Sequence, residues 1–224
     1  AFTDAILGSL FASFIKGKGI EINRYSQLSF EYDFILKIIL IFSFCVFIYI
    51  VYFINGFSFK SYDELMATKG KVVSDFILTQ GFGLSLINCG ILGLLSLILT
   101  SFLKAPLNGP LVAGIFTVFG FGAMGKHPLN CIPVVTGVVL ASYAKVWEFD
   151  SFNVALSALF GTTLAPISGA FGPFIGVIAG FFHLFIVNNI GITHEGMNLY
   201  NNGFSGGLVA GIMIPILKKM GKEV

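Results

Sequence analysis

Polar side chains that could bind a small solute gather in one stretch of an otherwise apolar sequence. Residues 191–215 place His194, Glu195 and three asparagines directly before a glycine-rich apolar run, and the asparagines are Asn198, Asn201 and Asn202. Carboxamides both donate and accept hydrogen bonds, so the set suits a neutral polar solute or a partly dehydrated ion. Because polar groups are costly against lipid, we expect them to face protein or a water-filled cavity. An extramembrane loop capped by asparagine is the alternative.

The helix that should follow this polar stretch is short. The apolar run 203–217 would measure roughly 22 Å at about 1.5 Å per residue, which is less than the ~30 Å hydrocarbon core of a bilayer. A short helix entered through a polar, glycine-broken segment is typical of a discontinuous helix at a midplane substrate site. The sequence therefore predicts a solute site near residues 194–207.

Two further breaks carry groups of the same kind. Asn108 lies in the Pro/Gly/Asn stretch 105–110, and Thr162 and Thr163 lie in the break 161–166. For any single asparagine, helix capping is an equally good explanation. The clustering of carboxamides and hydroxyls on three short segments favours a lined pathway, whose substrate-binding residues would be Asn108, Thr162, Thr163, His183, His194, Asn198, Asn201 and Asn202.

The basic and imidazole groups allow two interpretations each. Lys126 and His127, between Gly125 and Pro128, are candidates for gating an entrance or contacting an anion, and the alternative is a wetted interfacial turn. His183 lies near the centre of the apolar run 171–190. An intramembrane histidine is a proton relay or pore donor by default, and a hydrogen-bonded structural role is its alternative.

Composition defines the class of protein. Hydrophobic residues make up 56% of the 224 residues and charged residues only 11%, against about 25% charged residues in a soluble domain. The apolar runs are continuous and of helical length, which excludes a membrane β-barrel of alternating strands. The net charge of +2 comes with no basic stripe, so nucleic acid is not an expected partner.

No enzymatic motif is present. His194-Glu195 is not part of an H-E-x-x-H pair, and no third ligand follows at metal spacing. The three cysteines, Cys45, Cys89 and Cys131, form no C-x-x-C pair. We therefore expect no catalytic residues, no metal and no cofactor.

The apolar runs predict helices of unequal length. Residues 34–54 form the clearest transmembrane helix, and the absence of glycine places it at the periphery. Residues 81–103 form a second span, whose Gly83, Gly90 and Gly93 allow close packing in the bundle core. A half-helix or re-entrant helix is expected at 111–124. Fuller spans are expected at 131–147 and 171–190, shorter runs at 153–166 and 203–217, and a short interfacial helix within 55–75.

The first residues repeat the last helix. Residues 1–8 align without gaps with 203–210, and Lys16 falls on Lys218. We interpret 1–19 as the terminal helix of a preceding repeat, 20–75 as a linker containing helix 34–54, and 76–224 as a second repeat. Lysines near the ends of both repeats favour a cytoplasmic position for these ends. Whether the two repeats are parallel or inverted stays open. Asp4 is either an N-terminal dipole partner or a site residue.

Several motifs occur in an order that resembles a known family: 107–110, 115–121, 125–128, 132–133, 161–166 and 196–204. They resemble bacterial polytopic membrane proteins catalogued as a domain of unknown function and built of two homologous halves. The likeness covers most of 76–217 and implies that the chain is the second half of such a protein plus the end of the first. The Asn-Gly turns before short glycine-rich helices are more loosely similar to those of urea transporters.

Together these observations predict an all-α, polytopic integral membrane bundle with short broken or re-entrant helices. We expect a transporter or channel for a small polar solute or ion in the bacterial inner membrane. Its partners would be the lipid bilayer, the missing first repeat and a homo-oligomer. A structural or assembly subunit is the alternative, ahead of a membrane-embedded enzyme.

Overall fold

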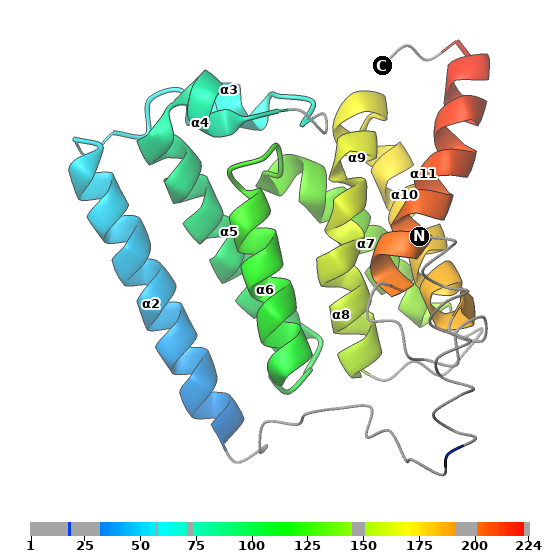
Figure 1. Ribbon diagram of the computed structural model, residues 1–224, viewed down its shortest axis with the longest axis horizontal. Helices are drawn as coiled ribbons and strands as arrows, with labels where there is room; N and C mark the ends of the chain where they lie inside the picture. The colour runs from blue at the N-terminus through cyan, green and yellow to red at the C-terminus, as the bar shows by residue number, and fades with distance from the viewer. Residues whose placement is uncertain are drawn as a thin grey trace.

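The computed structural model describes residues 18, 32–56, 58–70, 74–144, 151–190 and 201–221, and every regular element within them is helical (Figure 1). Four helical segments are long and apolar enough to cross a membrane: Asp33–Ile54, Phe82–Phe102, Ser151–Phe171 and Pro173–Ile190. The prediction of an all-α membrane bundle is thereby confirmed. The predicted first-repeat helix apart from Lys18, its Asp4 included, and residues 20–31 of the linker lie outside the described residues.

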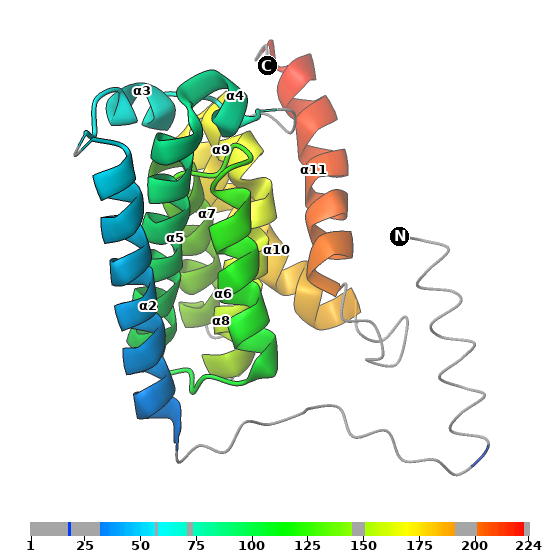
Figure 2. The same ribbon diagram turned by 60° about the vertical axis from the view of Figure 1, so that its left-hand side comes forward.

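Helix α2 (Asp33–Ile54) lies at one edge of the bundle and packs on α5 (Phe82–Phe102) (Figures 1 and 2). Most of its large apolar side chains are exposed, as expected for a lipid-facing helix. Glycines on α5 let the two helices approach closely, because a Cβ at Gly93 would lie 2.9 Å from the Phe44 ring. Both predictions for these helices, a peripheral first span and a core second span, are confirmed.

Helices α3 (Tyr62–Met66) and α4 (Phe76–Gln80) cover one end of the bundle, the upper end in Figure 1. Leu65 and Phe76 are fully buried there against Leu84 of α5. The predicted short helix within 55–75 is confirmed as α3.

Helices α6 (Gly109–Phe121) and α7 (Pro128–Tyr143) form a hairpin that enters and leaves at the end opposite α3 and α4 (Figure 1). At ~1.5 Å per residue they measure about 20 and 24 Å, too short to cross an untilted bilayer. The turn between them, residues 122–127, is held beside Asn88, about 9 Å along α5 from its first residue. The short α6 agrees with the half-helix or re-entrant helix expected at 111–124. The sequence predicts a fuller span at 131–147; α7 begins three residues earlier, and residues 145–147 lie outside the described residues.

The prediction of a short helix at 153–166 is wrong. Helix α8 (Ser151–Gly161) continues through the 3₁₀ turn η2 (Thr162–Leu164) into α9 (Ala165–Phe171), and the whole segment has 21 residues. The local cause is Pro166, which has no N–H to donate and whose ring conflicts with the carbonyl of Thr162 four residues earlier. The helix tightens over one turn and then resumes, so the Pro/Gly signal marks a break within a spanning segment.

Helix α10 (Pro173–Ile190) packs closely against α7. A Cβ added to Gly180 would overlap the Val134 carbonyl oxygen, and one added to Gly137 would overlap that of Val177. The backbones of the two helices thus touch at two glycines, which fixes α10 next to the re-entrant hairpin.

Helix α11 (Asn201–Lys219) lies at the edge opposite α2 and packs on α10 (Figure 2). Its 19 residues span about 28 Å, so the expectation of a short helix at 203–217 is wrong. Asn201 and Asn202 belong to its first turn instead of preceding it. The estimate counted only the apolar run, whereas the helix also includes the polar residues at its ends, Asn201, Asn202, Lys218 and Lys219.

Candidate functional site

The break in the α8–α9 segment is the point where buried polar groups from several elements meet. Thr162 is the twelfth of 21 residues in this segment, close to its middle, and only 2% of it is exposed. Three neighbouring positions face different partners: Thr162 faces the α6–α7 turn, Gly161 faces α10, and the methyl group of Thr163, an otherwise exposed residue, faces α11. We call the residues around this break the break cluster and define it by Lys126, Thr162, Thr163, His183, Asn202 and Ser205.

Lys126 reaches the break from the α6–α7 turn. Its Nζ donates to Thr162 Oγ1 at 2.8 Å, while the Thr162 hydroxyl donates to the Leu159 carbonyl at 2.6 Å. The ammonium also lies 4.7 Å from the centre of the Phe121 ring, within cation–π range. Lys126 is 7% exposed, and no carboxylate of the described chain pairs with it. A buried cation without a counter-charge is costly.

Asparagines hold the turn that carries Lys126. Asn88 Nδ2 donates to the carbonyls of Gly122 and Lys126 at 2.7 and 2.8 Å, and Asn88 Oδ1 accepts from the Tyr62 hydroxyl at 2.9 Å. Burial raises the pKa of Tyr62 to about 12, so this phenol stays protonated and donates. Asn130 closes the turn from α7 by donating to the Gly125 carbonyl at 2.9 Å. The position of Lys126 is therefore fixed by side chains of α3, α5 and α7.

A second polar group lies on the α10–α11 side of the break. His183 is fully buried, and its Nε2 lies 3.3 Å from Asn202 Oδ1. With that oxygen facing the ring, Nε2 carries the hydrogen and Nδ1 is an acceptor. Gly161 leaves room for the imidazole, because a Cβ there would lie 2.9 Å from His183 Cδ2.

Several buried polar atoms on this side have no hydrogen-bond partner among the described residues: His183 Nδ1, Ser205 Oγ and Asn201 Oδ1. Ser205 is fully buried one turn beyond Asn202 on α11. Most buried polar atoms in proteins are paired, so a group of unpaired ones calls for a ligand, water or a further part of the protein.

The structure brings together Lys126, Thr162, Thr163, His183 and Asn202 of the predicted site residues, and it places Asn201 beside them. Thr163 contacts α11, where a Cβ on Gly206 would lie 2.6 Å from Thr163 Cγ2. His194 and Asn198 lie outside the described residues.

Two predicted residues point elsewhere. Asn108 caps α6, because its Oδ1 accepts from the Leu111 N–H at 3.0 Å, and this is the capping alternative. His127 turns away from Lys126, and its Nε2 lies 3.0 Å from the Thr68 carbonyl oxygen in the segment after α3. The side chains of these two adjacent basic residues therefore contact different parts of the protein and do not form one site.

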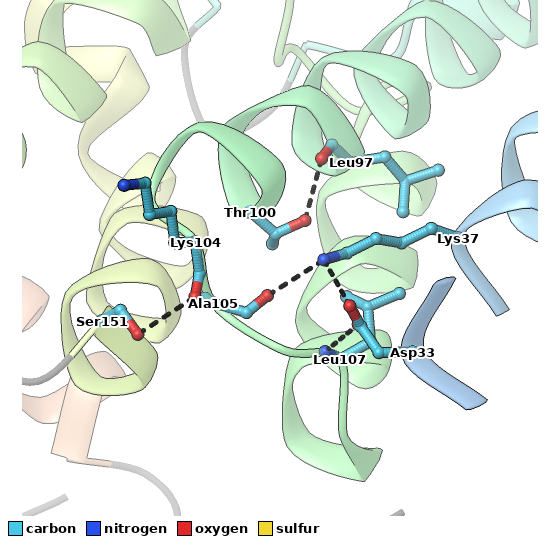
Figure 3. A network of polar contacts seen from close by, with 8 residues as sticks. All are labelled: Asp33, Lys37, Leu97, Thr100, Lys104, Ala105, Leu107 and Ser151. Atoms are coloured by element: carbon cyan, nitrogen blue, oxygen red, sulfur yellow. Dashed lines mark hydrogen bonds and ion pairs between the residues drawn. The ribbon is translucent and has the colours of Figure 1, made fainter. Parts of the chain in front are cut away.

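The turn that precedes Asn108 is tied to α2 at the end of the bundle opposite α3 and α4. Figure 3 shows Asp33 accepting from the Leu107 N–H at 2.7 Å and pairing with Lys37 at 2.8 Å. Lys37 Nζ also lies 3.5 Å from the Ala105 carbonyl. These bonds make residues 105–108 an anchor for α2.

The sequence predicted Lys126 as a candidate but neither Asn88, which holds its turn, nor Ser205. Asn88 could have been identified from its carboxamide inside a spanning helix, because polar residues at membrane depth usually have a functional or structural role. For metal binding, no group of three histidine, cysteine or carboxylate side chains comes together in the described ranges.

An apolar cavity of about 260 Å³ lies between α5 and α7, and its floor is formed by α6 and α8. Its mouth is lined by the exposed Ile98, Phe102 and Ile132, and its inner end contains Ser96, Cys131 and Thr162. Thr162 therefore lines the cavity and also accepts from the buried ammonium of Lys126, which is not itself a lining group.

The fold and the break cluster define a helical membrane bundle with a broken helix and a buried polar interior. The chain belongs to the family described as "Protein of unknown function (DUF1576)", whose model matches residues 54–219, from the last residue of α2 to the last of α11. No curated protein and no solved structure matches the chain. The resemblance to a family of unknown function is confirmed, while the internal repeat and the likeness to urea transporters stay predictions.

Proposed function

We propose that this chain forms part of a membrane transporter or channel for a small polar solute or ion. The observation that carries the proposal is the break cluster: polar groups of four elements converge near the middle of a spanning segment, and two of its fully buried residues carry unpaired atoms. Polar side chains at membrane depth are costly and are retained chiefly where they contact a solute, an ion or water. Broken helices supply such sites in known transporters.

The proposed pathway runs along the break and the first turns of α11. Thr162 and Thr163 offer hydroxyls, Asn202 a carboxamide and His183 a ring nitrogen. We leave Asn108 out of the pathway because its oxygen is used by the α6 cap. His194 and Asn198 precede α11 in sequence and stay candidates for the same pathway.

The wider setting is also a proposal. We place the protein in the bacterial inner membrane as a multi-pass subunit without enzymatic activity. The other half of a two-repeat protein or a second copy would complete the enclosure of the pathway.

A structural or assembly role is the second candidate. The observation in its favour is that the side chains of Asn88, Asn108 and Asn130 all bond to backbone groups of the protein itself. Such a subunit would show the same fold without solute flux.

Flux into proteoliposomes tests the proposal, with urea as the neutral probe and methanesulfonate as a permanently charged one. We expect saturable flux of at least one probe, and its loss in Thr162→Val. Thr136→Val is the matched control, since Thr136 is an exposed threonine on α7 that bonds only the Ile132 carbonyl of its own helix. Equal flux in protein-containing and empty vesicles would reject transport of these probes and favour the structural role.

A further inference from the structure

We propose that the cavity between α5 and α7 binds a small organic monoanion with a short apolar body, whose anionic group lies at Thr162 and Lys126. The inference rests on the proposed function, because it names the class of solute that the break cluster recognises. It assigns a role to the cavity and to the unpaired charge of Lys126.

Charge is the first argument. Lys126 has three N–H donors, and the structure gives its ammonium one oxygen acceptor, Thr162 Oγ1, and one aromatic face. Two of the three donors thus lack an oxygen acceptor, and no carboxylate of the described residues lies within ion-pair distance of Lys126. A carboxylate or sulfonate would neutralise the charge and use these donors, which a neutral solute does only in part.

The shape and lining of the cavity supply the second argument. Its walls are almost entirely apolar, and the few polar lining groups, Ser96, Cys131 and Thr162, lie at its inner end. Ser96 and Thr162 already donate their hydrogens to carbonyls of their own helices, so they hold no strongly hydrated ion by themselves. An apolar body along α5 and α7 would place the anionic head beside Thr162, and its donor would be the Lys126 ammonium, which lies behind Thr162 at 2.8 Å from its hydroxyl oxygen.

Size is the third argument. A volume of about 260 Å³ corresponds to roughly eight or nine water molecules and lies just below the range of drug-sized ligand pockets. A molecule such as hexanoate or hexanesulfonate fits that space, while a whole lipid chain would extend out of the mouth. The mouth opens between Ile98, Phe102 and Ile132, so the apolar body can enter from the membrane side.

Binding of a matched pair of probes to the protein in lipid nanodiscs tests the inference by titration calorimetry, with empty discs as background. Hexanesulfonate is permanently ionised, and hexanol has the same chain without the charge. We expect hexanesulfonate to bind at least tenfold more tightly than hexanol. We expect Lys126→Met to weaken hexanesulfonate about tenfold to a hundredfold and to leave hexanol unchanged. Lys60→Met, at an exposed lysine, should change neither affinity.

A second pair of variants tests the cavity itself and does not depend on the stability of Lys126→Met. Val135→Phe, at a lining position on α7, should weaken both probes at least tenfold. Leu140→Phe lies on an exposed face of the same helix outside the cavity and should be neutral. Equal affinities for the two probes in the wild-type protein would mean a site for hydrocarbon or a lipid chain and would overturn the inference. Absence of binding would overturn it as well.

The flux assay separates this inference from the proposed function. Charge-selective binding without flux of any probe would uphold the anion site and reject transport. Flux of urea without binding of hexanesulfonate would uphold transport and reject the anion site.

Discussion

Replacing Asn88 by leucine is expected to destabilise the protein by about 2–4 kcal/mol. Leucine has the same number and branching of side-chain heavy atoms as asparagine and a larger volume, so the change removes polar groups without opening a cavity. Three hydrogen bonds between elements would disappear: two to the Gly122 and Lys126 carbonyls and one from Tyr62. The α6–α7 turn would lose its contact with α5.

The magnitude follows from two estimates that overlap. Hydrogen bonds between membrane helices average about 0.6 kcal/mol with a maximum near 1.7, so three give roughly 2 kcal/mol and at most about 5. A buried carbonyl left unpaired costs about 1–3 kcal/mol, which gives roughly 2–6 for two carbonyls. Tyr62 is only half-buried and its hydroxyl can turn to water, so we add nothing for it.

Equilibrium unfolding in mixed micelles, followed by circular dichroism, measures this loss. Ser96→Ala is the control in the same helix, because Ser96 bonds only the Leu92 carbonyl of α5, and it should cost less than about 1 kcal/mol. Tyr62→Phe removes one of the three bonds and should cost about 0.5–1.5 kcal/mol. The reasoning is refuted if Asn88→Leu unfolds at the wild-type midpoint, or if Tyr62→Phe is as damaging as Asn88→Leu.

Two further predictions concern packing and capping. Gly180→Ala should destabilise the protein by about 1–3 kcal/mol because the added Cβ overlaps the Val134 carbonyl. Gly207→Ala, with open space around it, should be neutral or stabilising by up to about 1 kcal/mol. Equal unfolding midpoints for the two variants would contradict the close approach of α7 and α10. Asn108→Ala should cost about 1 kcal/mol through the lost α6 cap while leaving the KM of any solute flux unchanged, and a shift in that KM would return Asn108 to the pathway.

Much of the fold was predictable because hydrophobic length is a local property of the chain. Residues 34–54 form α2 within one residue of the predicted bounds, and 81–103 became α5. The break near Thr162 was also visible from Gly161 and Pro166. Its consequence was not, because a break that ends a helix and one that only tightens it have the same local sequence.

Capping and lining are likewise indistinguishable for an isolated asparagine. Asn108 and Asn202 belong to similar Asn-Gly sequences, yet one bonds its own helix and the other faces His183. The difference depends on which elements pack beside each asparagine, and the residues adjacent in sequence do not determine those tertiary neighbours.

The sequence by itself determined that the chain is helical and membrane-embedded, that the run 111–124 is too short to cross, and that polar groups flank and interrupt the apolar runs. These properties follow from hydropathy, helix rise and the chemistry of proline and glycine. Only the tertiary structure decided which polar groups meet. It turns His127 towards Thr68 and Lys126 towards Thr162, although the two residues are adjacent. The physical reason is that two asparagines hold the backbone of the turn in the orientation that buries the lysine. Asn88 lies on α5, far from Lys126 in sequence, and Asn130 lies on α7, the helix that follows the turn.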